Sequence, residues 1–260
     1  MADDEPPRKS HFDCYAKKMG GDAVETVLRE TAKPEEFKYI WLKKNLLTIV
    51  PLGVYRYTSI CILDLSNNPL LHLSEDISRL QSLEGLAICK CGLNMLPDSL
   101  GSLVNLTFLF AARNKLTFMP DSFTALSKMC RLDMGSNRLV NAPWIKHMTF
   151  LTHLKLSNNL IKCLPSAVTS LAKLVSIKLR NNSGLGHFAA DARNEEDCQL
   201  LLQEIGQHFV RHENCKKVVI EVLAIRKFAE SVLNVIQKDV VRLICVWLWL
   251  SRNDDEWEFL

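Results

Sequence analysis

The sequence lacks the segments that mark secreted and membrane-spanning proteins. Met1 is followed by acidic and polar residues rather than by an apolar stretch, so we expect no secretory signal peptide. The most apolar run, Leu243 to Leu250, is too short to cross a bilayer, and Arg242 interrupts its approach. The sequence therefore predicts no membrane span.

Catalytic signatures are also missing. The chain has no P-loop, no G-x-G-x-x-G, no H-E-x-x-H and no G-x-S-x-G motif. Cys89 and Cys91 form a C-x-C pair, but no second pair or histidine cluster accompanies them, and a structural metal site needs four ligands. We therefore expect no enzyme activity, no cofactor and no metal.

Charge and cysteine content set further limits. The 32 basic and 29 acidic residues leave a net charge of +3, which does not by itself imply a nucleic-acid partner. Nine cysteines, an odd number without paired clusters, favour free thiols in a reducing compartment, and so a cytoplasmic or nuclear protein. With 260 residues, 48% of them apolar, the chain can form one or two domains with a real core.

One pattern occupies more than half of the chain. Its frame, L-x-x-L-x-L-x-x-N-x-L, is met by Leu106, Leu109, Ala111, Asn114 and Leu116. We call the Asn of the frame the anchor position. Seven residues hold it: Asn45, Asn68, Cys91, Asn114, Asn137, Asn159 and Asn182. The anchors are 23 residues apart, except for a step of 22 from Asn137 to Asn159.

The physical chemistry of one repeat can be read from its residues. Leu109 and Ala111 alternate as in a short strand, with their side chains inward and their neighbours outward. The anchor amide can donate and accept, so stacked anchors predict a ladder, whereas the thiol of Cys91 predicts a weaker rung. A proline six residues after most anchors, as at Pro97 and Pro120, is followed by apolar residues at helical or 3₁₀ spacing. Such repeats must stack to bury their apolar faces.

These residues resemble the leucine-rich repeat family, from Phe37 to Asn182. The resemblance implies an α/β fold, a solenoid of about seven repeats with a parallel sheet on its concave side. The 23-residue step and the L-P in the return are similar to intracellular Ras-binding and Scribble-type scaffolds. Such proteins are adaptors without catalysis, which implies a protein partner on the concave face.

Four regions are expected: a disordered terminus at 1–21, a cap helix at 22–36, the solenoid at 37–184 and a helical subdomain at 185–260. Asp22 and Glu25 have the spacing of a capping box at the start of the cap helix. The helix would cover the open end of the first repeat, as solenoids require; the alternative is a partner-binding helix.

Three helices are expected after the repeats. Asn194 can cap the first, in which Leu201, Ile205 and Phe209 share one face. A second covers about 216–235, and a third starts near Asp239. The third faintly resembles an F-box. The resemblance implies an alternative, in which the repeats hold a substrate and this helix docks a ubiquitin ligase through Val240, Val241, Ile244, Trp247 and Trp249.

The outward strand residues are the candidate partner-binding site. An aromatic zone comprises Tyr39, Trp41, Ile62, Phe108 and Phe110. A basic zone, suited to acidic groups, comprises Arg131, His153, Lys155, Lys178 and Arg180. Asp64 and Asp133 also belong to the predicted site. Exposed aromatic residues are common interface hot spots.

Other interpretations of this face remain open. The N-terminal segment could cover Tyr39 and Trp41, with the basic side chains simply solvated. His153 and Asp133 could pair on adjacent strands, although no nucleophile completes a catalytic set. RNA binding would use the basic zone, but the interleaved aromatics and strong positive charge typical of that function are missing.

Overall fold

The computed structural model describes residues 11–31, 34–188, 191–207 and 210. The chain falls into two units, residues 1–202 and 203–260, and the repeats lie in the first. The expected helices at 216–235 and from Asp239, with the proposed ligase-docking residues, lie outside the described residues. In the described part, no helix is both long and apolar enough to cross a membrane.

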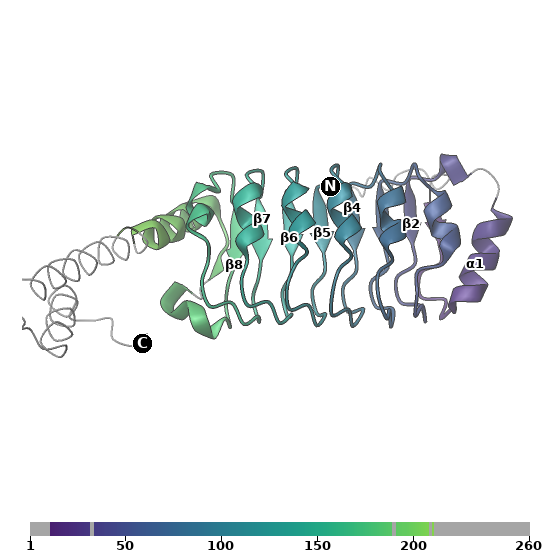
Figure 1. Cartoon of the computed structure of the whole chain (residues 1–260), viewed down its shortest axis with the longest axis horizontal. Coiled ribbons are helices and arrows are strands. Elements are labelled where there is room, and N and C mark those ends of the chain that lie inside the picture. Colours follow the sequence, from purple (N-terminus) through teal and green to yellow (C-terminus); the bar gives the residue numbers. More distant parts are fainter. Residues whose placement is uncertain (1–10, 32–33, 189–190, 208–209, 211–260) are drawn as a thin grey trace, which may run out of the picture. The chain divides into compact units, whose positions relative to one another are not determined.

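Every predicted repeat contributes one short strand to a single sheet (Figure 1). The strands are β1 His11–Asp13, β2 Tyr39–Trp41, β3 Ile62–Asp64, β4 Gly85–Ala87, β5 Phe108–Phe110, β6 Arg131–Asp133, β7 His153–Lys155, β8 Ser176–Lys178 and β9 Asp191–Ala192. They are hydrogen-bonded in sequence order, and β1 to β8 run parallel. This is a leucine-rich repeat solenoid, as the sequence predicts.

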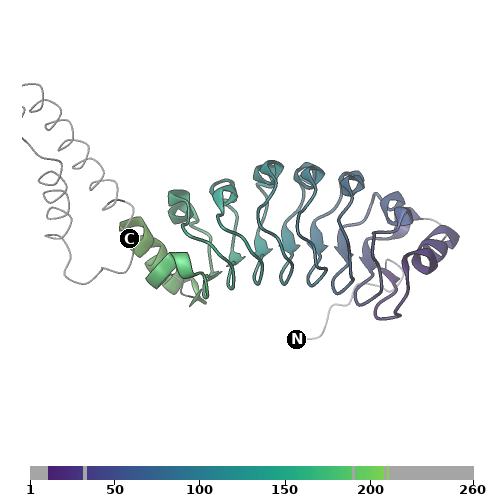
Figure 2. The same ribbon diagram turned by 60° about the horizontal axis from the view of Figure 1, so that its bottom comes forward.

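Short 3₁₀ helices form the opposite, convex side, as Figure 2 shows. They are η3 Leu52–Arg56, η4 Glu75–Arg79, η5 Asp98–Ser102, η6 Asp121–Ala125, η7 Pro143–His147 and η8 Ser166–Ser170. Four of them begin directly after the repeat prolines Pro51, Pro97, Pro120 and Pro165. Two further 3₁₀ helices, η2 Pro34–Glu36 and η9 Ser183–Phe188, are not part of this convex row. The core between the two sides is made of the frame residues, such as Leu106, Leu109 and Ala111, which are fully buried.

The anchor asparagines form the predicted ladder. The Nδ2 of Asn137 donates to its own strand at Met134 O (2.9 Å) and to the preceding repeat at Ala111 O (3.0 Å). Its Oδ1 accepts from Leu116 N at 3.1 Å. The pattern recurs at Asn68, Asn114, Asn159 and Asn182. Each amide thus satisfies three buried backbone groups that no strand reaches.

Cys91 makes a weaker rung. Its Sγ lies 3.3 Å from Leu65 O and 3.5 Å from Cys89 O, but it offers no amide oxygen to Leu70 N. The N–H of Leu70 donates instead to Asn68 O, at 2.9 Å. Burial raises the pKa of the Cys91 thiol to about 11, so it stays protonated and acts as a weak donor.

Replacing Cys91 by asparagine should therefore stabilise the protein. The new amide would give Leu65 O a stronger donor than the thiol and offer Leu70 N the oxygen that the other anchors provide, and we expect a gain in the free energy of unfolding of about 1 kcal/mol. Urea denaturation of C91N and wild type measures it. An unchanged or lower midpoint would show that the ladder does not need an amide at this rung.

The N-terminal region differs from the expectation of disorder at 1–21. Residues 11–13 form β1, parallel to β2, and the side chains of Phe12 and Cys14 are buried. Asn45 Nδ2 donates to Cys14 O at 2.7 Å, as the other anchors do to the repeat before them. The segment thus begins an additional repeat, in which Lys17 holds the anchor position.

The cap helix α1, Gly21–Glu30, is shorter than the predicted 22–36 and lacks the predicted capping box. Gly20 is its N-cap and provides no side-chain bond. Glu25 does not reach back toward Asp22; its Oε2 accepts from Gly53 N at 2.7 Å, which ties α1 to η3. With Val24 and Leu28 fully buried, α1 lies at the open end of the solenoid as a cap should (Figure 1).

Two irregularities complete the solenoid. The 22-residue step is absorbed on the convex side, where η7 begins at Pro143 itself, and β7 keeps its register with β6. At the far end β9 pairs antiparallel with β8, which covers the last parallel strand.

A helix follows from residue 195, capped as predicted by Asn194, whose Oδ1 accepts from Asp197 N at 2.8 Å. Leu201 and Ile205 on it are buried, while Phe209 lies outside the described residues.

Candidate functional site

The strand register places the predicted site residues in two rows across the concave sheet, except for Arg180, which follows the end of β8. The first row is His11, Tyr39, Ile62, Gly85, Phe108, Arg131, His153 and Ser176. The second row is Asp13, Trp41, Asp64, Ala87, Phe110, Asp133, Lys155 and Lys178. Neighbouring strands lie about 4.8 Å apart, so members of one row are within reach of each other.

Phe108 and Phe110 form the centre of the aromatic zone. Their ring centroids are 5.4 Å apart, and both side chains are half-buried. The Phe108 ring lies over Gly85 in the next strand, in space that a Cβ on Gly85 would occupy. The glycine thus makes room for the ring, and Ile62, the next residue of this row, is also half-buried. Phe108, Phe110 and Ile62 thus place apolar side chains in the middle of the concave face.

The N-terminal end of the aromatic zone is partly covered. His11 stacks on Tyr39 with centroids 4.8 Å apart, and Tyr39 lies parallel to Trp41 at 6.5 Å. Both Tyr39 and Trp41 remain half-buried, so β1 shields them without closing them off. Asp64, between Trp41 and Ala87 in the second row, is buried, and its Oδ1 accepts from Ser66 N at 2.8 Å. Asp64 therefore holds the turn after β3 rather than facing a partner.

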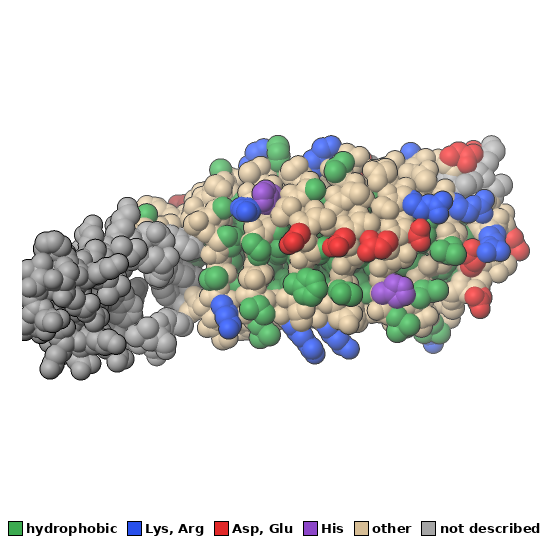
Figure 3. Space-filling view, in the orientation of Figure 1, with side chains coloured by type: hydrophobic (Ala, Val, Ile, Leu, Met, Phe, Trp, Pro, Cys, Tyr) green, Lys and Arg blue, Asp and Glu red, His purple; other side chains and the backbone are tan. Residues whose placement is uncertain are grey.

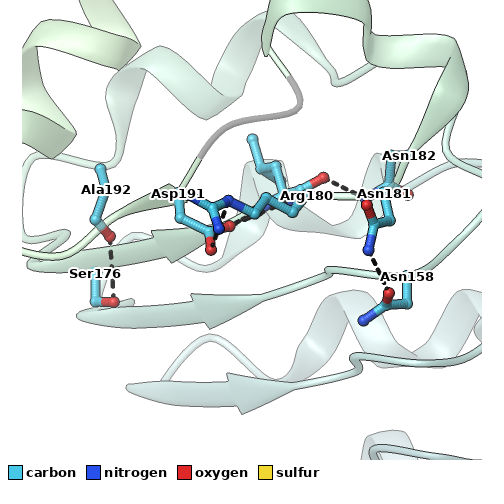
Figure 4. A network of polar contacts seen from close by, with 8 residues as sticks. Asn158, Ser176, Arg180, Asn181, Asn182, Asp191 and Ala192 are labelled. Atoms are coloured by element: carbon cyan, nitrogen blue, oxygen red, sulfur yellow. Dashed lines mark hydrogen bonds and ion pairs between the residues drawn. The ribbon is translucent and has the colours of Figure 1, made fainter.

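The basic zone is partly neutralised by carboxylates. Lys155 Nζ lies 3.2 Å from Asp133 Oδ2, and Arg180 Nε lies 3.4 Å from Asp191 Oδ2 (Figure 4). Asp191 also accepts from the backbone of Leu179 and Arg180, which fixes β9 against the end of β8. Arg131 and Lys178 make no ion pair within the described residues. They are therefore the cations that this face leaves for a ligand.

The sequence left open a pair between His153 and Asp133, but the structure does not form it. Its Nδ1 shares a hydrogen bond of 2.9 Å with Thr152 Oγ1, and Asp133 binds Lys155 instead. Burial, followed by the charges of Arg131 and Lys155, lowers the pKa of His153 below 6.5. The neutral imidazole is therefore favoured near pH 7, and His153 adds no positive charge to the basic zone.

The lowered pKa of His153 predicts a pH effect on stability. The unfolded chain binds a proton at His153 more readily than the folded chain, so the free energy of unfolding falls as the pH drops through about 6.5. Urea denaturation at neutral and mildly acidic pH should show a larger loss for wild type than for H153Q. Equal losses would mean that folding does not change the affinity of His153 for protons.

Three site residues could not be seen in the repeat frame. His11 and Asp13 belong to β1, and Asp191 belongs to the antiparallel β9. The only sequence signal for β1 was the alternation of the apolar residues Phe12 and Cys14. A long stretch of chain separates them from the first recognised repeat, which starts at Phe37. Asp191 carries no local signal, because its role depends on the pairing of β9 with β8.

No protein-family model matches the sequence. A transforming growth factor beta activator of Danio rerio, LRRC33, is 35% identical over 117 residues, which is 42% of this chain and 16% of that protein. The curated relatives that the chain matches are much longer, and it spans 2%, 16% and 4% of three of them. Similarity of this extent concerns a part of those proteins and not their whole activity.

Solved structures share the fold. A leucine-rich repeat protein of Leptospira interrogans superposes with a TM-score of 0.55 at 28% identity, over 57% of this chain and 38% of that one. Internalin C2 of Listeria monocytogenes gives a TM-score of 0.57 at 23% identity, over 68% and 76%. Repeats of this kind generally present an extended concave surface for protein interactions. The stacked strands, the asparagine ladder and these likenesses together indicate a leucine-rich repeat protein.

Proposed function

We propose that this chain is a non-catalytic interaction module, a scaffold or adaptor that binds a protein partner on its concave face. The observation that carries the proposal is the Phe108–Phe110 pair. Two aromatic rings, 5.4 Å apart and half-exposed at the centre of a rigid sheet, have no covering element in the described structure. Aromatic side chains in such a position contribute strongly to protein interfaces.

The charges beside this pair indicate the chemistry of the partner. Arg131 follows Phe108 in the first row, and Lys178 ends the second. Both lack ion-pair partners in the described structure, whereas Lys155 and Arg180 are already held by Asp133 and Asp191. A partner with an apolar or aromatic segment followed by a carboxylate near Arg131 fits this arrangement.

The alternatives gain no comparable support. RNA would meet Asp133 beside Lys155 in the second row, and stacked aromatics do not alternate with the cations. The ubiquitin-ligase alternative depends on residues outside the described structure. A cytoplasmic or nuclear location, with free thiols, completes the proposal.

The double variant F108A/F110A tests it. Both rings lie at the surface of the sheet, so their removal should leave the solenoid folded while reducing partner affinity by about 100-fold or more. The matched control is F118A/F150A, which removes two exposed phenylalanines elsewhere. Affinity capture with quantitative mass spectrometry compares the three proteins, and thermal unfolding confirms that each is folded.

A partner that is lost with F108A/F110A and kept with F118A/F150A supports concave-face binding. If every captured protein is retained by F108A/F110A, the aromatic zone is not the interface. Loss with both variants would show that the capture depends on exposed phenylalanine in general and would also contradict the proposal.

A further inference from the structure

The loops that follow the strands form a second surface with its own chemistry. Each runs from the residue before the anchor to five residues after it, and we call these the anchor loops. Six of them comprise residues 44–50, 67–73, 90–96, 113–119, 136–142 and 158–164. An even spread of the chain's 29 acidic residues over 260 positions would place four or five of them here. The anchor loops contain none.

Basic residues are retained in the same loops. They are Lys44, Lys90, Arg113, Lys115, Arg138 and Lys162, all exposed. In the part of the chain that the structure describes, Lys44 alone of the six makes a side-chain hydrogen bond through its charged group, to the Tyr15 hydroxyl at 2.9 Å. Within the described residues none of the six makes an ion pair. The whole chain has a net charge of only +3, but the anchor loops form a flank with six cations and no anion.

Apolar side chains are exposed between these cations. They are Leu46, Ile49, Leu71, Met95, Phe118, Val140 and Leu160. Leu71 is 68% exposed, and Phe118 is 51% exposed, although the repeat frame places no requirement for an apolar residue at either position. Figure 3 shows hydrophobic and basic side chains along the lower edge of the repeats, with acidic side chains in a row above them.

The backbone holds these side chains on one continuous edge. Lys115 N donates to Leu93 O at 2.7 Å, and Arg138 N donates to Leu116 O at 2.8 Å, so each loop rests on the loop before it. With a repeat spacing of about 4.8 Å, six stacked loops extend over roughly 25 Å. The cations and apolar groups therefore lie along one edge of a rigid support.

We propose that this flank of anchor loops binds the surface of an anionic lipid bilayer. Lysine and arginine side chains are attracted to acidic headgroups, while scattered Leu, Met and Phe side chains enter the boundary between headgroups and acyl chains. Carboxylates would be repelled there, and the loops have none. Nucleic acid would use the cations but leave the apolar side chains in water, so the combination favours lipid. This surface is separate from the concave face and leaves it open to a protein partner.

The charge variant can be designed so that it does not weaken the fold. Lys90 and Arg113 have positive φ, 55° and 59°, and asparagine occupies the equivalent position at Asn67, Asn158 and Asn181. Asparagine adopts this conformation more readily than lysine or arginine. The test variant is K90N/R113N/K115Q/R138Q. The control, R79Q/K128Q/K146Q/K173Q, removes the same charge from exposed residues outside the anchor loops.

The measurement is co-sedimentation of the full chain with phosphatidylcholine vesicles, with and without phosphatidylserine. We expect binding only with phosphatidylserine, weakened by added salt. Each cation near such a surface accounts for roughly a fivefold change in affinity, so the test variant should bind about 100-fold less tightly or worse. The control variant should bind like wild type.

A second variant separates insertion from charge alone. L71S/M95S/F118S keeps every cation and should bind phosphatidylserine vesicles at least about tenfold less tightly, because three apolar side chains no longer enter the bilayer. F108A/F110A, which tests the concave face, should bind vesicles as wild type does, so the two proposals fail independently.

Four results would overturn lipid binding by the flank. They are no sedimentation with phosphatidylserine vesicles, equal losses for the test and control charge variants, unchanged binding of L71S/M95S/F118S, and displacement from vesicles by an acidic protein that the same loops bind more tightly.

Discussion

Replacing Asn137 by alanine is expected to lower the free energy of unfolding by about 2–4 kcal/mol. The amide satisfies the carbonyls of Ala111 and Met134 and the N–H of Leu116, all in the interior of the stacked repeats. Alanine leaves the N–H of Leu116 unpaired, which costs about 1–3 kcal/mol. It also takes one of two donors from each carbonyl, because Ala111 O keeps Asn114 Nδ2 and Met134 O keeps Asn159 Nδ2. The sum is reduced where water or a small backbone shift reaches them.

Two controls make this measurement specific to the ladder. Asn94→Ala changes the same residue type at an exposed position and should alter stability by less than about 0.5 kcal/mol. Cys91→Ala removes a rung that holds its carbonyl only through a thiol, and we expect a loss of about 1 kcal/mol. Equal effects of N137A and C91A in urea denaturation would contradict the ladder as a major source of stability.

Gly101→Val is expected to destabilise the protein by about 3 kcal/mol. Gly101 lies in η5, where a Cβ would overlap the backbone oxygen and carbon of Ser122 in η6. The backbone of a neighbouring helix cannot move aside as the end of a side chain can, so the two convex helices must separate. The change would open the stack between the repeats of Cys91 and Asn114.

The matched control for this prediction is Gly21→Val at the start of α1. A Cβ on Gly21 meets no atom within 4 Å, so this substitution should leave the melting temperature almost unchanged. Thermal unfolding of G101V and G21V measures the two melting temperatures and tests this prediction. If G101V unfolds at the same temperature as wild type, η5 and η6 do not need their close approach.

The repeats were predictable because each carries its own signal. The frame around Asn68 or Asn114 sets the strand, the inward side chains and the anchor, and the register follows from the constant step. The weaker rung at Cys91 followed from the chemistry of a thiol. The rows of the candidate site followed in the same way, since the residues between inward leucines must face outward.

The ends of the solenoid were less predictable. β1 carries Lys17 instead of an anchor Asn, and 28 residues separate Lys17 from Asn45, so the repeat frame does not reach it. The ion pairs of Lys155 and Arg180 depend on which carboxylate the fold brings near them. A sequence pattern can place a basic residue on a face, but tertiary contacts decide how much of its charge remains available.

Photo-crosslinking from the concave face is the most direct test of where a partner binds. Benzoylphenylalanine would replace Phe110 in one protein and Phe118, on the anchor loops, in another, so that both probes substitute an exposed or half-exposed phenylalanine. Concave-face binding predicts a protein adduct from position 110 that position 118 does not give. No adduct at 110, or the same adduct from both positions, would contradict it.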